Sequence, residues 1–411
     1  MQMFLKPISI SLSPNTEKDD IRLAFNLIFQ RWKWRKGKAV EKLENEFKKY
    51  LGVKHAFAFN SGRTSLMAIL KSLKLKSQDE VLLQSFTCNA AANPVIWSGL
   101  KPVYVDCDQN NFNIDLKDIK DKISLKTKAI IIQHTFGLPA NMNEVLDFAR
   151  KNNLILIEDC AHSLGAKYRG KKIGTFGKAA FFSFSRDKVI SSVYGGMVVV
   201  NDDNIAGRIL KFQKELKYPS CFWILQQLFH PVLMNFLILP TYLILGKYFL
   251  IFFQWFKILS KAVHWKEKRA KKPGYFPKKM PNSLALLALN QFKKLEKFNG
   301  HRKKIADFYY KNLNNNSFKL PEKDNSIFLR FTIKHPNAHN IIKNAWKKNF
   351  LIGDWYTSPI APKDTKLDKL QYKKGLCPKA EKLSKTTLNL PTHINISENQ
   401  ARVLTKYLNM L

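Results

Sequence analysis

Short apolar runs alternate with helical segments between residues 40 and 200, and this alternation constrains the fold more than any other feature of the sequence. Polar turns bound each of the runs HAFAFN, VLLQSF, PVYVDC, AIIIQHTF and LILIEDC. Helical periodicity marks segments between them, such as MNEVLDFARKNN and the segment VEKLENEFKKYL, which Gly52 follows. Strands of this kind joined by helices predict an α/β fold, with a mostly parallel central sheet and helices on both faces.

Residues with useful chemistry follow the apolar runs, at the edge where parallel sheets bind their ligands. Asp159 comes near the end of LILIEDC, and Lys188 lies between two later strand-like runs. An enzyme that uses pyridoxal-5'-phosphate (PLP) needs both groups. An amine forms the imine with the cofactor aldehyde, and a carboxylate keeps the pyridine nitrogen protonated. On these two residues alone, an ordinary solvated pair is the simpler explanation.

The segment NSGRTS at residues 60–65 follows the run HAFAFN and begins a helix. Glycine lets the backbone approach a ligand closely. Free amides at a helix N-terminus, together with a Ser or Thr hydroxyl, suit a phosphate group. An ordinary helix cap, with Ser61 or Thr64 as the N-cap residue, explains the same segment equally well.

Longer motifs then occur in a fixed order: SGRTSL, SFTCNAAANPVIWSGLKPVYVDCD, HTFGLPANM, IEDCAHSLGAKYRGKKIGTFGKAAFFSFSRDK and a Gly pair. In this order they closely resemble the DegT/DnrJ/StrS family of PLP-dependent nucleotide-sugar aminotransferases. The entry segment KAVEKLENEFKKYLGVKHAFAFNSG and the C-terminal segment CPKAEKLSKTTLNLPTH look like that family too. The resemblance covers everything except roughly residues 216–275. It implies the PLP-dependent transferase fold of aspartate aminotransferase (type I).

The resemblance and the changes in composition together divide the chain into three parts. We expect a large PLP-binding α/β domain at residues 1–215 and an apolar, basic helical insertion at residues 216–275. A smaller C-terminal α+β domain then follows at residues 276–411.

The resemblance assigns roles residue by residue. It implies that Lys188 carries the cofactor as a Schiff base, that Asp159 pairs with the pyridine nitrogen and that His162 contacts the phenolic oxygen of the ring. Ser183 and the Gly62-Arg63-Thr64 turn match phosphate-binding elements. The full set of expected cofactor-binding residues is Gly62, Arg63, Thr64, Cys88, Asp159, His162, Ser183 and Lys188.

Two of these positions depart from the family pattern. The family usually has Thr where this chain has Arg63, so phosphate contact there comes either from a guanidinium or from the backbone alone. An aromatic residue often stacks on the cofactor ring where this chain has Cys88, and the smaller side chain predicts weaker retention of the cofactor.

Lys188 also indicates the type of reaction. The resemblance implies that dehydratase relatives keep the fold but replace this lysine by histidine, so a lysine points to transamination. We expect an amino group to pass from the donor Glu to a keto sugar on a nucleotide carrier, for surface polysaccharide or glycan biosynthesis. We expect the enzyme to be a homodimer. The alternatives are a PLP-fold sugar dehydratase and a non-catalytic, membrane-associated relative.

About 29 residues without formal charge, at 218–246, precede a strongly basic stretch. Their length meets the criterion for a membrane span, but Pro231 and Pro240 divide them. Broken helices that enter one leaflet, or lie along it, fit this pattern better than a clean crossing. We therefore expect residues 218–272 to bind an anionic membrane surface. The alternative is an extra helical pair packed on the core or in a dimer interface.

The formal net charge is +38, from 69 Lys and Arg against 31 Asp and Glu. Such a balance favours polyanionic neighbours, although a generally Lys-rich surface explains it equally well. The basic stretch adjoins apolar sequence and no nucleic-acid recognition motif, so nucleic acid is not the expected partner. Five widely spaced cysteines without a C-x-x-C pair suggest neither disulfides nor a metal site. We expect a cytoplasmic protein, peripheral or monotopic at the inner face of the membrane.

Overall fold

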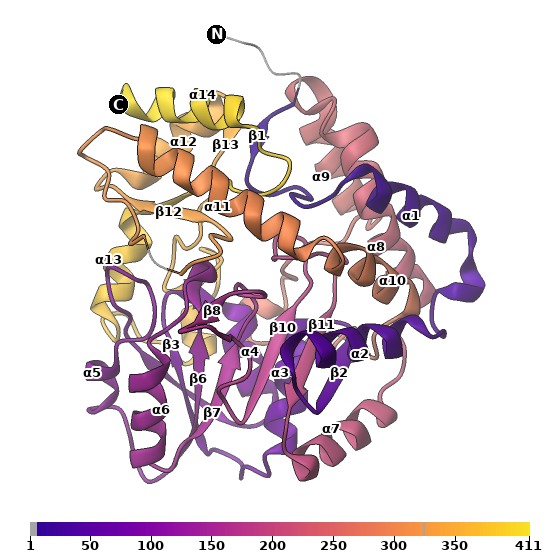
Figure 1. Ribbon diagram of the computed structural model, residues 1–411, viewed down its shortest axis with the longest axis vertical. Helices are drawn as coiled ribbons and strands as arrows, with labels where there is room; N and C mark the ends of the chain where they lie inside the picture. Colours follow the sequence, from indigo (N-terminus) through magenta and orange to yellow (C-terminus); the bar gives the residue numbers. More distant parts are fainter. Residues whose placement is uncertain (1–5, 324) are drawn as a thin grey trace.

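The computed structural model describes residues 6–323 and 325–411. A seven-stranded sheet in the order β2-β11-β10-β7-β6-β3-β5 forms the centre of the large domain (Figure 1). Its strands are β2 (His55–Phe59), β3 (Glu80–Gln84), β5 (Lys101–Val105), β6 (Thr127–Gln133), β7 (Ile155–Asp159), β10 (Ala179–Ser183) and β11 (Gly196–Val200). The strands from β10 to β5 are parallel, and β11 runs antiparallel to both of its neighbours. The predicted mostly parallel sheet is confirmed.

Helices cover both faces of this sheet. One face packs against α2 (Ala39–Leu51), α6 (Met142–Lys151) and α10 (Asn282–Phe292), and the other packs against α3 (Gly62–Ser72), α4 (Asn89–Trp97) and α7 (Asp203–Glu215). Along β2, Ala56 and Ala58 belong to the first core while Phe57 and Phe59 belong to the second, because side chains alternate along a strand. The two cores fix the sheet between helical layers.

The smaller domain is built on the antiparallel pair β12 (Phe331–Lys334) and β15 (Thr387–Leu390). Its core adds side chains from α11 (Leu295–Asn312), α12 (Ala338–Lys347) and α14 (Glu398–Asn409). The N-terminal strand β1 (Ile8–Ser9) pairs here with β13 (Phe350–Leu351), whereas α10 and α13 (Pro378–Thr386) contribute to the cores of the large domain. Packing therefore crosses the boundary expected at residue 276 in both directions.

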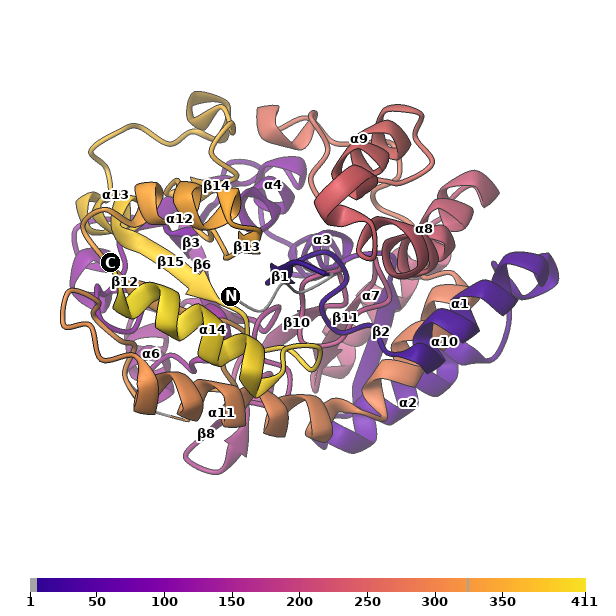
Figure 2. The same cartoon turned by 90° about the horizontal axis from the view of Figure 1, so that it is seen from above.

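The apolar segment forms α8 (Cys221–Leu233), two π-helical turns, η3 (Met234–Ile238) and η4 (Tyr242–Gly246), and α9 (Lys247–Trp255). α8 buries Trp223, Ile224 and Leu228 in the core shared with α2 and α10, and it packs beside α1 (Lys18–Phe29). In contrast, α9 has no buried residue. Figure 2 places α8 and α9 on the side of the molecule away from α14 and β15. The first half of the segment, α8, is thus part of the core, and the second half, α9, projects from the surface.

Short elements complete the chain. They are the pair β4 (Thr87–Cys88) and β14 (Ile360–Ala361), the hairpin β8 (Lys167–Tyr168) and β9 (Lys171–Lys172), α5 (Leu116–Ile119), η1 (Arg31–Lys33), η2 (Thr135–Gly137), η5 (Glu267–Arg269) and η6 (Leu367–Leu370). The parallel pairing of β4 with β14 brings the segment after Gly353 to the carboxyl edge of the central sheet.

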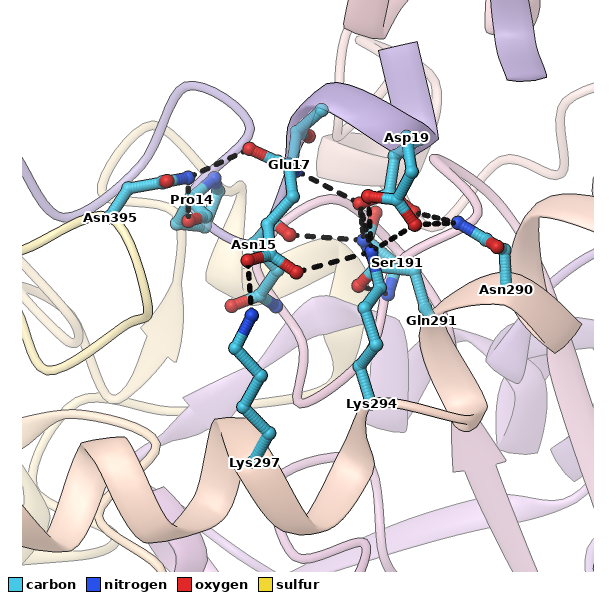
Figure 3. A network of polar contacts seen from close by, with 12 residues as sticks. Pro14, Asn15, Glu17, Asp19, Ser191, Asn290, Gln291, Lys294, Lys297 and Asn395 are labelled. Carbon is cyan, nitrogen blue, oxygen red and sulfur yellow. Dashed lines mark hydrogen bonds and ion pairs between the residues drawn. The ribbon is translucent and has the colours of Figure 1, made fainter. Parts of the chain in front are cut away.

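A polar network joins the start of α1 to the junction of α10 and α11 (Figure 3). Lys294 Nζ lies 2.8 Å from the buried carboxylate of Asp20 and 2.9 Å from that of Asp19, and it also pairs with Glu17. Gln291 donates to Asp20 and to the carbonyl of Asn15. The network therefore fixes the N-terminal segment against the helices that begin the second half of the chain.

Removing the shared cation of this network should destabilise the fold. We expect Lys294→Met to lower the free energy of unfolding by about 3 kcal/mol, because it leaves the buried Asp20 carboxylate without a counter-ion. Lys297→Met is the matched control, since Lys297 is 58% exposed and pairs only with Glu17. We expect it to cost less than about 1 kcal/mol. Urea unfolding measures both, and equal losses would contradict the assigned role of Lys294.

Candidate active site

A pocket lies at the carboxyl ends of the central strands, between the large domain and the segment after Gly353. It gathers residues that are far apart in the sequence. Seven of the eight expected cofactor-binding residues line it: Gly62, Arg63, Cys88, Asp159, His162, Ser183 and Lys188. The edge of a parallel sheet thus brings together the groups that the sequence placed after separate apolar runs.

Thr64 is the exception. Its hydroxyl donates to Asn60 Oδ1 at 2.8 Å, and its backbone N–H donates to the Ser61 side chain, which caps α3. Thr64 is fully buried and does not line the pocket. The ordinary helix cap considered for this segment therefore accounts for Ser61 and Thr64.

Lys188 lies in the irregular loop between β10 and β11. Asn15 donates to its carbonyl, and Arg302 donates to the next carbonyl, that of Val189, at 2.8 Å. The Nζ atom lies 5.0 Å from the centre of the Trp355 ring. Burial lowers the pKa of Lys188 to about 8, with the positive charge of Arg330 acting in the same direction. At pH 7 about a tenth of this amine is therefore neutral and nucleophilic, a far larger share than in an ordinary lysine.

Asp159 is the last residue of β7, where register pairs it with Gln133 of β6 and Phe181 of β10. One carboxylate oxygen accepts the backbone N–H of Ala161 at 3.0 Å. Burial raises the pKa of Asp159, partly offset by that hydrogen bond and by the charge of Lys188. Asp159 has no ion-pair partner in the part of the chain that the structure describes, and such a buried carboxylate is suited to a cationic group of a ligand.

His162 is buried beside these two residues. Its Nδ1 accepts the backbone N–H of Phe136 at 3.3 Å, and its ring stacks on Trp355 with 5.4 Å between centroids. Burial, followed by the charges of Lys188 and Arg330, holds the pKa of His162 well below its usual value. The imidazole is therefore neutral, with Nε2 toward the Tyr356 hydroxyl at 3.4 Å.

The start of α3 forms one wall of the pocket. A Cβ at Gly62 would lie 3.0 Å from the Cβ of Ser183, and a Cβ at Gly196 would lie 2.6 Å from the amide of Gly62. Position 196 therefore requires glycine, because a Cβ there would meet the backbone, and Gly62 is a tight position at which Ser183 would have to shift slightly. This wall presents a helix N-terminus beside a serine hydroxyl, which is a suitable arrangement for phosphate.

The contacts of the Arg63 guanidinium argue against a simple role in binding phosphate. Its Nε forms an ion pair with the fully buried Glu267, and NH2 donates to the carbonyl of Ala262 at 3.3 Å. Arg63 also lies over the ring of Phe276. Burial has the largest single effect on the pKa of Arg63 and lowers it, but the charge of Glu267 together with smaller effects of neighbouring groups raises this pKa overall. The arginine therefore stays charged, and Glu267 compensates its charge.

Cys88 stands at the other side of the pocket, at the end of β4 and at the N-cap of α4. Its register partner in β14 is Ala361, and its sulfur accepts the backbone N–H of Ala90. Burial raises the pKa of this thiol. Cys88 is therefore a small, neutral contact and has no features of a reactive thiolate.

Several lining residues were not identified from the sequence. Asp354, Trp355, Tyr356 and Thr357 come from the loop that β14 draws to the sheet edge, and Arg186 comes from the loop of Lys188. The GDWYT segment carries no periodicity or motif that would mark it as part of a site. Its one usable signal is its density of polar and aromatic residues.

Behind the pocket, the side chains of His134, Glu158 and Cys160 place possible ligand atoms within 4.8 Å of one another. Glu158 accepts the backbone N–H groups of Gly174, Phe176 and Gly177, and His134 Nδ1 accepts the N–H of Ala140. These hydrogen bonds explain the cluster as a structural one that holds the β9–β10 connection.

Comparison with known proteins places this geometry in a family. The sequence profile of the DegT/DnrJ/EryC1/StrS aminotransferase family matches residues 15–217 and 254–408. The chain belongs to this family. The match leaves out residues 218–253, which is a shorter segment than the expected insertion at 216–275.

Individual relatives agree with this membership. GDP-perosamine synthase of Escherichia coli O157:H7 is 31% identical over 69% of this chain and 65% of that protein. UDP-N-acetyl-3-dehydro-alpha-D-glucosamine 3-aminotransferase of Acidithiobacillus ferrooxidans is 29% identical over 88% of this chain and 86% of that protein. Among solved structures, the aminotransferase PseC of Helicobacter pylori aligns with a TM-score of 0.76 over 98% of both chains, at 22% identity. The alignment with the GDP-perosamine synthase of E. coli covers slightly less than two thirds of the length of that protein.

The residues of the pocket fit PLP. A buried amine of lowered pKa, Lys188, lines the same pocket as a buried carboxylate, Asp159. The glycine-lined N-terminus of α3 and Ser183 supply an anion-binding wall. These are the amine, the pyridine partner and the phosphate cradle that this cofactor requires.

The lowered pKa of Lys188 predicts the pH dependence of its reaction with PLP. The attachment rate should rise with pH through an apparent pKa of about 8, because only the neutral amine attacks the aldehyde. In Asp159→Asn this apparent pKa should fall further, since a negative charge that favours the ammonium is lost. Stopped-flow absorbance measures both. A wild-type value near 10.5 would show that the amine is not desolvated.

Proposed function

We propose that this protein is a PLP-dependent aminotransferase that transfers an amino group from Glu to a keto sugar on a nucleotide carrier. One observation carries the proposal: the buried amine of Lys188 and the buried carboxylate of Asp159 line one pocket with the N-terminus of α3. The names of the relatives support the substrate class, since they include a GDP-perosamine synthase, a UDP-sugar aminotransferase and a dTDP-sugar transaminase.

Each residue has a defined role in this reaction. PLP supplies an electron sink that stabilises negative charge at the substrate carbon next to nitrogen. Asp159 keeps the pyridine nitrogen protonated, and neutral His162 offers a hydrogen bond at the pocket wall. Lys188, partly neutral near pH 7, accepts a proton at Nζ and returns it to a neighbouring carbon. The amide of Gly62 and the hydroxyl of Ser183 orient the phosphate.

A PLP-fold sugar dehydratase is the nearest alternative, and two solved GDP-4-keto-6-deoxymannose-3-dehydratase structures share this fold at 20–21% identity. Lys188 argues for transamination, because an ε-amine can both carry the cofactor and move a proton on it. We expect the amino sugar to be used in surface polysaccharide synthesis. One relative supports this use by its name, the spore coat polysaccharide biosynthesis protein SpsC of Bacillus subtilis.

A spectrum tests the catalytic proposal. The purified protein with added PLP should show a visible band that borohydride abolishes and that Glu converts to the spectrum of the amino form of the cofactor. Lys188→Ala should show neither change, because the attaching amine is gone. If the wild-type protein shows no band, the non-catalytic alternative takes first place.

We also propose that the functional unit is a homodimer, as the family resemblance implies. Light scattering on the holoenzyme should give about twice the chain mass of 47.6 kDa. A monomer at assay concentration that retains full activity would contradict this.

A further part of the proposal is that α9 and its flanks bind an anionic membrane surface from the cytoplasmic side. Large apolar side chains are exposed along this segment: Ile244 (74%), Leu245, Tyr248, Ile251 (64%), Phe252, Trp255 (76%) and Phe256. Exposed basic residues follow directly, among them Lys257, Lys261, Lys271 and Lys272. Each basic residue near anionic lipid contributes roughly 1 kcal/mol. Exposed apolar side chains with basic neighbours are typical of an interfacial helix.

The geometry favours lying on the surface over crossing the bilayer. Among the described residues, one helix, Cys221–Ile238, is long and apolar enough to cross a membrane by length and composition. It is 56% buried within the protein, as core helices of soluble proteins are. Both ends of the segment also return to the catalytic domain. The proposed location is therefore peripheral or monotopic at the inner membrane face.

Vesicle flotation tests the membrane proposal. The variant Ile251→Ser/Phe252→Ser/Trp255→Ser should bind anionic vesicles about tenfold or more weakly than the wild type, because it removes the apolar contacts of α9. The matched control Leu125→Ser/Trp346→Ser removes exposed apolar side chains elsewhere, at 96% and 44% exposure, and should float like the wild type. Equal flotation of all three proteins would rule out α9 as the membrane contact.

A further inference from the structure

Arg186, two residues before Lys188, lines the pocket and is only 8% exposed. Its NH2 group donates to the hydroxyl of Ser260, and its Nε atom has no hydrogen-bond partner. The guanidinium carbon lies 5.6 Å from the centre of the Tyr194 ring. Within residues 6–323 and 325–411, no carboxylate forms an ion pair with Arg186.

This situation differs from that of Arg63 in the same pocket. Glu267 neutralises Arg63 through a buried ion pair. Burial lowers the pKa of Arg186, and the nearby Tyr194 and Asp187 offset this effect only in part. Arginine nevertheless stays protonated at any physiological pH. Arg186 is therefore a buried, permanently charged group of the pocket whose charge the described residues leave largely uncompensated.

A buried cation without a counter-ion is costly unless a ligand provides the negative charge. The surrounding groups suit an anion. The amide end of α3 at Gly62 and the hydroxyls of Ser183 and Ser185 line the same pocket. His230 of α8, which lies near Arg186, is buried, and its pKa is held well below the usual value, so it adds no competing charge.

The position of the guanidinium depends on a relay of hydrogen bonds. The Ser260 hydroxyl, which accepts from Arg186, donates to Gln227 Oε1 at 2.7 Å. Gln227 is fully buried in α8 and donates to the carbonyl of Trp223, also at 2.7 Å. Gln227 belongs to residues 218–253, which the family profile does not match. The segment that the family profile does not match thus reaches the pocket through Ser260.

We propose that Arg186 binds a phosphate group in this pocket and that Ser260, held by Gln227, positions its guanidinium. The inference rests on the proposed function, which supplies two such groups: the phosphate monoester of PLP and the diphosphate of the nucleotide carrier. Arginine recognises both by paired, charge-assisted hydrogen bonds.

Binding measurements on the full chain test the proposal without relying on turnover. Dissociation constants are compared for PLP, for pyridoxal, which lacks the phosphate, and for GDP and UDP as probes of the nucleotide. Arg186→Gln should weaken binding of the phosphate ligand by about 10- to 100-fold, the usual worth of hydrogen bonds to a charged group. Arg186→Lys should recover part of the loss. Arg208→Gln, with the same charge change on α7, should leave binding unchanged.

The pattern across ligands identifies the source of the phosphate. Loss for PLP with unchanged pyridoxal binding assigns Arg186 to the cofactor phosphate. Loss for GDP and UDP with unchanged PLP binding assigns it to the nucleotide. In either case Ser260→Ala should show a smaller loss for the same ligand, about three- to tenfold. Ser260→Thr, which keeps the hydroxyl, should restore binding.

Two outcomes would overturn the inference while leaving the aminotransferase proposal intact. One is unchanged binding of every phosphate ligand by Arg186→Gln. The other is an equal loss for pyridoxal and PLP, which would indicate general damage to the pocket. A wild-type protein that binds neither PLP nor pyridoxal would instead count against the proposed function itself, and against this inference with it.

Discussion

The loop between β10 and β11 carries Lys188 through the interior without regular secondary structure, so its backbone polar groups need partners from elsewhere. Asn15 and Arg302 provide them, by donating to the carbonyls of Lys188 and Val189. Arg302 is fully buried and also donates to Asn15 Oδ1 and Asn299 Oδ1. Buried backbone groups are almost always satisfied in this way. The geometry of the site therefore depends on residues from the first and the last thirds of the chain.

The same interior shows how charges are distributed for chemistry. Glu267 neutralises Arg63, and Lys294 neutralises Asp20, so these groups serve the fold. Lys188 and Asp159 share a pocket without pairing tightly, and burial moves their pKa values in opposite directions, that of the lysine down and that of the aspartate up. Groups whose charge the protein does not compensate are the ones that remain available to a ligand.

The sequence predicted the sheet well because apolar runs and helical periodicity are local properties. The topology of a parallel sheet drew attention to Asp159 and Lys188, but the family motifs assigned their roles and added His162 and Ser183. Thr64 was expected to bind the cofactor; in the structure its hydroxyl donates to Asn60, and it does not line the pocket. Arg186, Trp355 and Glu267 were missed because their roles arise from tertiary contacts that no spacing encodes. The sequence predicted the structure of the apolar segment only in part. Hydropathy cannot distinguish α8, which joins the core, from α9, which does not.

The segment from Ile8 to Asn15 has a mechanical consequence. Ile8 is paired with Phe350 in the small domain, and Asn15 is hydrogen-bonded to the loop of Lys188 in the large domain. The six residues between these two anchors, 9–14, therefore connect the two domains independently of α11. A tether that short sets an upper limit on how far the domains can swing apart, so access to the pocket is restricted by the N-terminus as well as by the loops around its mouth.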